Sequence, residues 1–204
     1  MFYSEGTELC VDDNIFNPTY HKTLEVKVLI TELFTERLHL RKMEVSDSSS
    51  LFKIWSNPDV TKFMNITNFT EQDQAKEMID FLNELSVQKK AIRYTIVEIK
   101  TNQIIGSCGF NTLDYENAKT EIGCDLDKAF WGKAYAPEAI SCLMRYAFDH
   151  LNFIRIEGKV DPENIKSIRL LQKLGFVFEG TLRKCERYKD KSFDLNIYSK
   201  LNTD

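Results

Sequence analysis

Residues 130–139, FWGKAYAPEA, place a glycine, several alanines and a proline directly before a regular helical pattern. The apolar positions that follow have the spacing of one helix face: Ile140, Leu143, Met144, Ala147 and Leu151. We expect Pro137 at the first helical position, where its missing N–H removes no intrahelical bond. Small residues that open a helix leave backbone N–H groups exposed at the positive end of the helix dipole, where anions bind. The stretch predicts a phosphate-binding loop or, taken alone, a tight strand-to-helix turn.

Three blocks of the sequence resemble the GNAT superfamily of acetyltransferases. Residues 131–136, WGKAYA, resemble its acyl-CoA signature, Gln/Arg-x-x-Gly-x-Gly/Ala. With Glu138 and Ala139 the string is similar to the RimJ/RimL-type branch, which acetylates protein N-termini and some small amines. Residues 161–180 resemble the Asn-x-x-Ser helix and the turn that ends it, and residues 55–61 resemble the segment between the first two helices of the family. The blocks occur in the order of the family.

The resemblance implies the GNAT fold, an α/β fold in which a mixed, mostly antiparallel twisted sheet of about seven strands is flanked by about four helices. Its central parallel strands splay apart. Alternation of apolar and polar residues predicts strands over 36–42, 92–99, 104–110, 120–127, 154–160, 176–182 and 193–198. We expect Asp47 to cap the first helix, Pro58 to end it, and Thr70 with Asp73 to cap the second.

The chain length fits a single domain, which we place at residues 31–204. Residues 1–30 form an extension in which residues 24–30 alternate like an edge strand. This strand either covers the edge of the sheet or pairs with a second subunit, which leaves a homodimer open.

The bulk composition excludes several classes of protein. Of the 204 residues, 43% are apolar and 28% charged, and a net charge of −4 gives no general attraction to nucleic acid or to an anionic membrane. The chain shows no signal peptide and no apolar run of transmembrane length, so we expect a cytoplasmic protein. Its cysteines and histidines lack the spacing of a metal site, and we expect reduced thiols and no metal.

Acetyl-CoA is the cosubstrate that the resemblance implies. Its pyrophosphate would bind the N–H groups around Gly132, Ala134, Tyr135 and Ala136, in the loop that begins at Trp131, and Lys133 would add a screened point charge. Backbone groups of Leu126 would bind the pantetheine arm, and Asn164 and Ser167 its amide. The alternative for Asn164 is a helix N-cap. Because Ala134 replaces the usual glycine, we infer that close approach of the phosphate, and not a positive φ, limits the size of this residue.

Transfer of acetyl to an amine requires a base, for which we select Glu121, with Asn164 as a second catalytic residue. Glu121 shares one face of its strand with Gly123 and Asp125. Its alternative interpretation is an ordinary salt-bridged glutamate. The general acid stays unassigned, because Tyr188 and Tyr198 match no motif of the family.

The resemblance makes Trp55, Phe63 and Met64 candidates for the wall of the acceptor site, with ordinary core packing as the alternative. We expect an N-acetyltransferase acting on the α-amine of a protein or peptide. Polyamine or amine-antibiotic acetylation, or CoA binding by a regulatory module without turnover, are the alternatives. An acidic pocket near residues 55–69 would favour polyamines, and a neutral groove would favour peptides.

Overall fold

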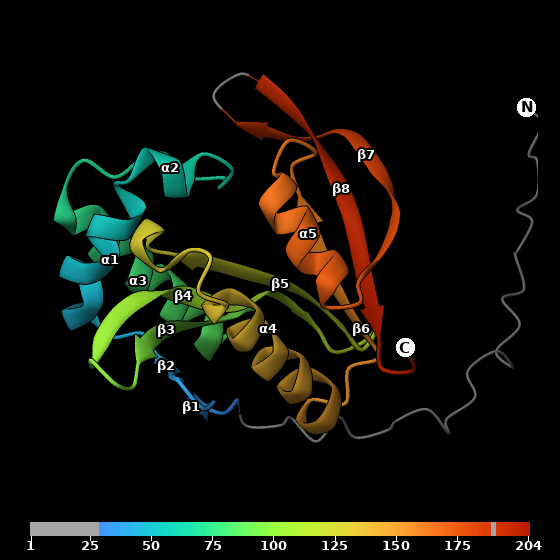
Figure 1. Cartoon of the computed structure of the whole chain (residues 1–204), viewed down its shortest axis with the longest axis horizontal. Coiled ribbons are helices and arrows are strands. Elements are labelled where there is room, and N and C mark those ends of the chain that lie inside the picture. Colours follow the sequence, from blue (N-terminus) through green and yellow to red (C-terminus); the bar gives the residue numbers. More distant parts are fainter. Residues whose placement is uncertain (1–28, 189–190) are drawn as a thin grey trace, which may run out of the picture.

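The computed structural model describes residues 29–188 and 191–204, which form one twisted sheet with helices on both faces (Figure 1). The strands are β1 (Glu32–Phe34), β2 (Leu38–Lys42), β3 (Ile92–Glu98), β4 (Gln103–Asp114), β5 (Lys119–Leu126), β6 (Arg155–Val160), β7 (Val177–Tyr188) and β8 (Lys191–Leu201). The α-helices are α1 (Ser48–Trp55), α2 (Pro58–Thr61), α3 (Gln72–Val87), α4 (Tyr135–Arg145) and α5 (Ile165–Lys173). The strand order is β1-β2-β3-β4-β5-β6-β8-β7, and each neighbouring pair is antiparallel except β5 and β6, which run parallel.

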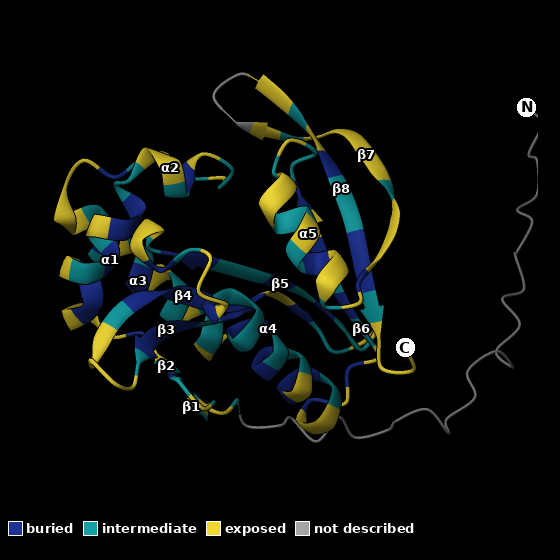
Figure 2. Ribbon diagram, viewed as in Figure 1, coloured by how far each residue is buried: buried dark blue, intermediate teal, exposed yellow. Residues whose placement is uncertain are grey.

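Two apolar clusters hold the helices against the sheet. The larger one joins Leu143 of α4 and Leu171 of α5 to inward side chains of β2 to β6, such as Ile122. The smaller one joins α1 and α3 on the opposite face, around Trp55 and Ile79. Figure 2 shows the buried residues gathered along the sheet and the inner side of α4. Helices therefore cover both faces of the sheet around β2 to β5. This packing holds β5, which carries part of the site, in place.

The parallel strands β5 and β6 separate soon after they meet. They pair only from Lys119 to Glu121, although β5 continues to Leu126. On the other side of β5, Asp127 N donates to the Ile105 carbonyl at 2.8 Å. Bonded and non-bonded pairs alternate in an antiparallel ladder, so the backbone groups of Leu126 point away from β4 and into the gap. The predicted splay of the central strands is confirmed.

The sheet and the helices differ in number from the prediction. The described residues form eight strands, because β1 lies ahead of β2, and five α-helices, because α2 forms in a segment expected to be an irregular loop. The Asn57 side chain accepts from Asp59 N, and Pro58 takes the first helical position, which is a complete start signal for α2. The predicted strand over residues 24–30 lies outside the described residues except for its last two, which are not in a strand.

Asp47 is the N-cap of α1, as predicted, but its side chain makes no capping hydrogen bond. Two other predicted helix starts are wrong. The N-cap of α3 is Glu71, and its side chain and that of Gln74 form a capping box in place of Thr70 and Asp73. Pro137 is the third residue of α4 and not the first. It is tolerated there because the first turn of a helix has no acceptor for its N–H groups.

Asp47 is instead the buried partner of Arg41. Its carboxylate accepts two hydrogen bonds from the Arg41 guanidinium, at 2.6 and 2.8 Å, one from Thr95 Oγ1 at 2.7 Å and one from Glu44 N at 3.0 Å. Burial alone would raise the pKa of Asp47, but these hydrogen bonds outweigh it and hold the pKa below its ordinary value. The ionised form is therefore the one that stabilises the fold.

Replacing Asp47 by Asn should destabilise the protein by about 1.5–3 kcal/mol near pH 6, because hydrogen bonds to a charged group are lost. The folded-state pKa is lowered, so this contribution is complete above the ordinary pKa and is lost as the pH falls through the lowered one. Urea unfolding of wild type and Asp47→Asn at pH 6 and pH 3 should show the difference in unfolding free energy narrowing in acid. A difference that stays constant would contradict the assignment.

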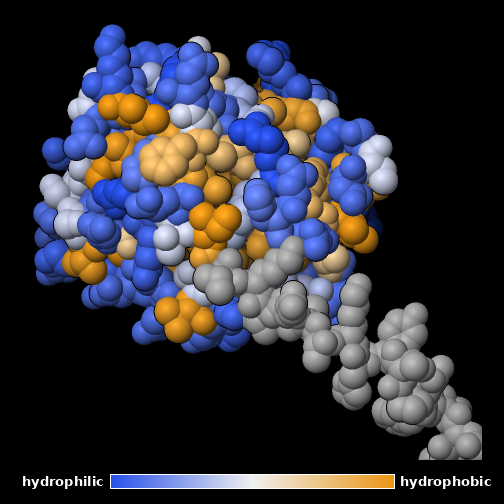
Figure 3. Space-filling model, turned by 90° about the horizontal axis from the view of Figure 1, so that it is seen from below, coloured by the Kyte–Doolittle hydropathy of each residue, from blue (hydrophilic) through white to orange (hydrophobic). Residues whose placement is uncertain are grey.

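The surface is mixed in character. Large exposed apolar side chains include Phe34, Phe81 and Val87. On the face seen in Figure 3, hydrophobic residues lie in several patches among hydrophilic ones. No helix in residues 29–188 or 191–204 is both long and apolar enough to cross a membrane. Scattered apolar residues are ordinary on a folded protein, so this composition marks no particular binding surface.

Candidate active site

A cleft of about 1110 Å³ opens where β5 and β6 separate. It is lined by nearly every residue that the sequence nominates for the site: Trp55, Phe63, Met64, Glu121, Leu126, Trp131, Gly132, Ala134, Tyr135, Ala136, Asn164 and Ser167. The exception is Lys133, which does not line the cleft and whose ammonium lies 5.0 Å from the centre of the Phe130 ring. The fold thus brings together residues from α1, β5, the loop before α4, and α5.

The loop before α4 has the geometry of an anion site. Gly132 and Ala134 both have positive φ, +74° and +63°, and Ala134 is the N-cap of α4 without a side-chain hydrogen bond. The N–H groups of Tyr135 and Ala136 in the first turn consequently lack an intrahelical acceptor. A Cβ added to Gly132 would meet no atom within 4 Å, so the space beside the loop is open. The residues present fit a bound phosphate group.

The inference about Ala134 is wrong. This residue adopts the left-handed conformation that favours glycine, at a cost of about 1–2 kcal/mol for a residue with a Cβ. Backbone conformation therefore matters at this position, and the surrounding contacts must hold the loop in it.

Arg37, the residue before β2, supplies such contacts and was missed in the sequence. Its guanidinium pairs with Glu138 at 2.6 Å, donates to the Lys133 carbonyl at 3.1 Å and lies 4.4 Å above the Tyr135 ring. Glu138 also accepts from Thr35 Oγ1 at 2.5 Å. Burial would raise the pKa of Glu138, but the bonds from Thr35 and Arg37 hold it below its usual value. The loop is therefore fastened from both ends to the β1–β2 connection.

Trp131 takes the place of the usual Gln or Arg and has a definite role. Its Nε1 donates to the Leu126 carbonyl at 2.9 Å, and the Lys166 ammonium lies 4.5 Å from the centre of its ring. Of the two backbone groups of Leu126 that face the gap, the carbonyl is thus already bound and the N–H remains. The indole ties the loop to the end of β5.

Asn164 has the structural role that was its alternative interpretation. Its side-chain oxygen accepts from Ser167 N at 3.2 Å and caps α5. Both residues also line the cleft. The cap occupies the side-chain oxygen of Asn164, so its amide NH₂ is the group left to bind a ligand.

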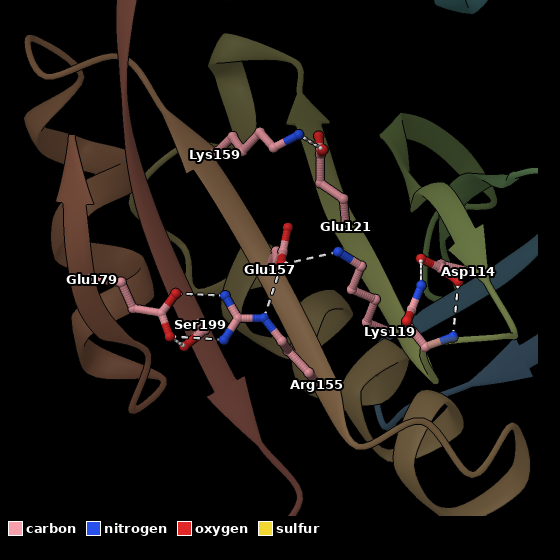
Figure 4. Close-up of polar contacts among 9 residues, drawn as sticks. Asp114, Lys119, Glu121, Arg155, Glu157, Lys159, Glu179 and Ser199 are labelled. Carbon is pink, nitrogen blue, oxygen red and sulfur yellow. Dashed lines mark hydrogen bonds and ion pairs between the residues drawn. The ribbon is translucent and has the colours of Figure 1, made fainter. Parts of the chain in front are cut away.

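Glu121 is salt-bridged and also lines the cleft. Its position is therefore compatible with both interpretations, a general base and a salt-bridged glutamate. Its carboxylate pairs with Lys159 at 2.7 Å and accepts from Asn111 Nδ2 at 2.9 Å (Figure 4 shows the contact with Lys159). The Glu121 side chain is 16% exposed. The hydrogen bond that Lys159 donates to Glu121 raises the pKa of Lys159, and this ammonium therefore stays charged.

A buried ion pair, Arg93 with Asp125, also lines the cleft and was not predicted as a pair. Asp125 also accepts from Ser107 Oγ at 2.6 Å and from Trp55 Nε1 at 3.2 Å. As expected from the alternation, Asp125 shares a face with Glu121, since a Cβ at Gly123 would meet Arg93 and Asn111 between them. An arginine within the apolar run of β3 was the signal for this pair.

Within the described residues, neither tyrosine considered as the general acid is seen in the cleft. Tyr198 is buried against Phe178, 5.3 Å between ring centres, and does not line the cleft. The side chain of Tyr188 lies outside the described part of the chain. Cys124 lines the cleft, but burial raises the pKa of its thiol to about 12. A thiol that holds its proton is a weak nucleophile, so the site favours direct attack by the amine.

Known proteins resemble this chain over most of its length. A family model described as "Acetyltransferase (GNAT) domain" matches residues 37–177. The uncharacterized N-acetyltransferase p20 of Bacillus licheniformis is 49% identical over 169 residues, covering 83% of this chain and 95% of that protein. The ribosomal-protein-serine acetyltransferase of Escherichia coli is 28% identical over 102 residues, covering 50% of this chain and 57% of its own.

Among solved structures, the microcin C7 self immunity acetyltransferase MccE, in complex with acetyl-CoA and AMP, is similar with a TM-score of 0.75. The identity is 26%, and the match covers 82% of this chain and 93% of that one. The family match contains the loop before α4, the splayed strands and the helix capped by Asn164. The chain therefore belongs to the GNAT family of acetyltransferases and is an acyltransferase.

Proposed function

We propose that the protein transfers acetyl from acetyl-CoA to the α-amine of a protein or peptide, as in the RimJ/RimL-type branch. The observation that carries this choice is the acceptor wall, which is apolar and not acidic: Val60, Phe63, Met64 and Ile66 line the cleft. The one carboxylate of this segment, Asp59, is paired with Lys128 at 2.7 Å. A neutral wall suits the side chain of a peptide N-terminus better than a polyamine.

Acetyl-CoA supplies the thioester from which the acetyl group is transferred. In this proposal the N–H groups of the loop from Gly132 to Ala136 bind its pyrophosphate, and the N–H of Leu126 binds the pantetheine arm in the gap between β5 and β6. The amide of Asn164 and the hydroxyl of Ser167 bind the arm from α5. Arg37 positions the loop without touching the ligand.

The transfer needs a neutral amine placed against the thioester carbonyl. The amine nitrogen forms the new C–N bond, the C–S bond breaks, and the thiolate leaves as CoA. Glu121 takes the proton that the amine loses, directly or through water, and Asn111 and Lys159 orient its carboxylate. An α-amine with a pKa of about 8 is about a tenth neutral at pH 7, so orientation and a weak base suffice.

The Glu121→Gln variant tests the site. We expect kcat/KM for a peptide acceptor to fall about 100-fold, the lower end of the range for general-base catalysis, with unchanged acetyl-CoA affinity. Release of CoA in the presence of a panel of peptides and small amines measures the first quantity, and calorimetry the second. Turnover that survives Glu121→Gln would remove Glu121 from the mechanism, and acetylation of small amines alone would remove the peptide acceptor.

A small-molecule acceptor is the second candidate, because the similar microcin C7 self immunity acetyltransferase was solved with AMP beside acetyl-CoA. The amine panel separates the two. Acetyl-CoA binding without turnover on any amine would instead support a regulatory module. A cytoplasmic location and a homodimer stay predictions.

A further inference from the structure

Lys159 is a charged residue of the cleft, and its position indicates a second role besides orienting Glu121. Figure 4 shows it reaching from β6 toward Glu121 on β5, 2.7 Å away. The two strands pair only up to Glu121 and Glu157, and Lys159 is two residues further along β6. Its ammonium group therefore crosses the gap at the point where the strands separate.

The pair of Lys159 and Glu121 differs from the neighbouring ion pairs on the same face of β5 and β6. Parallel pairing sets Glu121 opposite Glu157 and Lys119 opposite Arg155, which places like charges side by side. Glu157 is compensated twice, by Arg155 at 2.8 Å and by Lys119 at 3.9 Å. Glu121 is compensated by Lys159, and these two line the cleft whereas Lys119 does not.

The pairing decides what the Glu121 carboxylate can attract. A carboxylate without a partner would draw polyamines and other ammonium ions into the cleft. With Lys159 in place, a cationic acceptor meets a like charge there. A neutral amine can still donate an N–H to the carboxylate, because each oxygen accepts more than one hydrogen bond.

We propose that Lys159 determines acceptor specificity: its ammonium group keeps polycationic amines from Glu121 and reserves the site for weakly basic amines. At pH 7 about a tenth of an α-amine is neutral, but less than a thousandth of a lysine-type amine. This inference rests on the proposed function and adds a repulsive element to the apolar wall.

The test compares Lys159→Met with Lys119→Met. Both changes remove a half-exposed cation from one sheet face, with side chains 35% and 41% exposed, but only the first empties a position in the cleft. The readout is kcat/KM for spermidine divided by kcat/KM for a peptide with a neutral N-terminal side chain.

In Lys159→Met this ratio should rise about tenfold or more, chiefly through a lower KM for spermidine. Lys119→Met should leave it within about twofold, and adding Glu121→Gln to Lys159→Met should abolish the gain.

An unchanged ratio in Lys159→Met, with thermal stability in acetyl-CoA equal to wild type, would overturn the inference. So would a wild-type enzyme that prefers spermidine to the peptide. Failure of the proposed function would give a different result, the absence of turnover on every amine. In that case calorimetric titration of the acetyl-CoA complex with spermidine still decides: tighter binding by Lys159→Met supports the inference, and equal affinity overturns it.

Discussion

Replacing Gly132 by Asp is expected to abolish binding of acetyl-CoA. The residue has φ +74°, which strains any side chain by about 1 kcal/mol, and the open space beside it is where we place the pyrophosphate. An aspartate there sets a negative charge against the ligand and competes for the N–H groups at the start of α4. The loss of binding free energy for acetyl-CoA should exceed the loss of unfolding free energy.

Thermal unfolding with and without acetyl-CoA measures this directly. Ligand at about 100 times its Kd should stabilise the wild type by about 2.7 kcal/mol, or about 5–10 °C for a domain of this size. Gly132→Asp should show no shift. Gly180→Asp is the matched control, because Gly180 also has positive φ, +151°, and open space beside it but does not line the cleft. An equal shift in all three proteins would place the ligand elsewhere.

Local patterns in the sequence were enough to assemble most of the cleft. The helical spacing after Pro137 and the alternation around Glu121 depend on neighbours within one turn or one strand, and both are present in α4 and β5. The same holds for α2, where Asn57 and Pro58 carried a start signal that was overlooked.

Contacts between distant segments were not predictable in this way. Arg37 and Glu138 are 101 positions apart, and no local pattern predicts that they form an ion pair that holds the loop before α4 in place. The salt bridge of Glu121 with Lys159 depends on how β5 and β6 are set side by side. The positive φ of Ala134 is imposed by the loop and its contacts, and residue type alone argued against it.

Replacing Asp125 by Ala is expected to cost about 3–5 kcal/mol of unfolding free energy, the second large effect. The side chains of Asp125 and Arg93 are only 4% and 14% exposed, and removing the carboxylate leaves the guanidinium charge buried without its partner. Ser107 and Trp55 also lose their acceptor. Urea unfolding measures the loss, and Asp73→Ala, in a pair on the surface of α3, should cost less than about 1 kcal/mol.

The double variant Arg93→Met with Asp125→Asn separates the charge from the rest of the network. It removes both charges but keeps an acceptor for Trp55 Nε1, so it should recover more than half of the lost stability. A loss below about 1 kcal/mol in Asp125→Ala would show that water replaces the carboxylate. Because Asp125 ties Trp55 of α1 to β5, its loss should also loosen the acceptor wall from the sheet. We therefore expect the KM for the acceptor to rise in Asp125→Ala, while the affinity for acetyl-CoA, bound by the loop before α4, changes little.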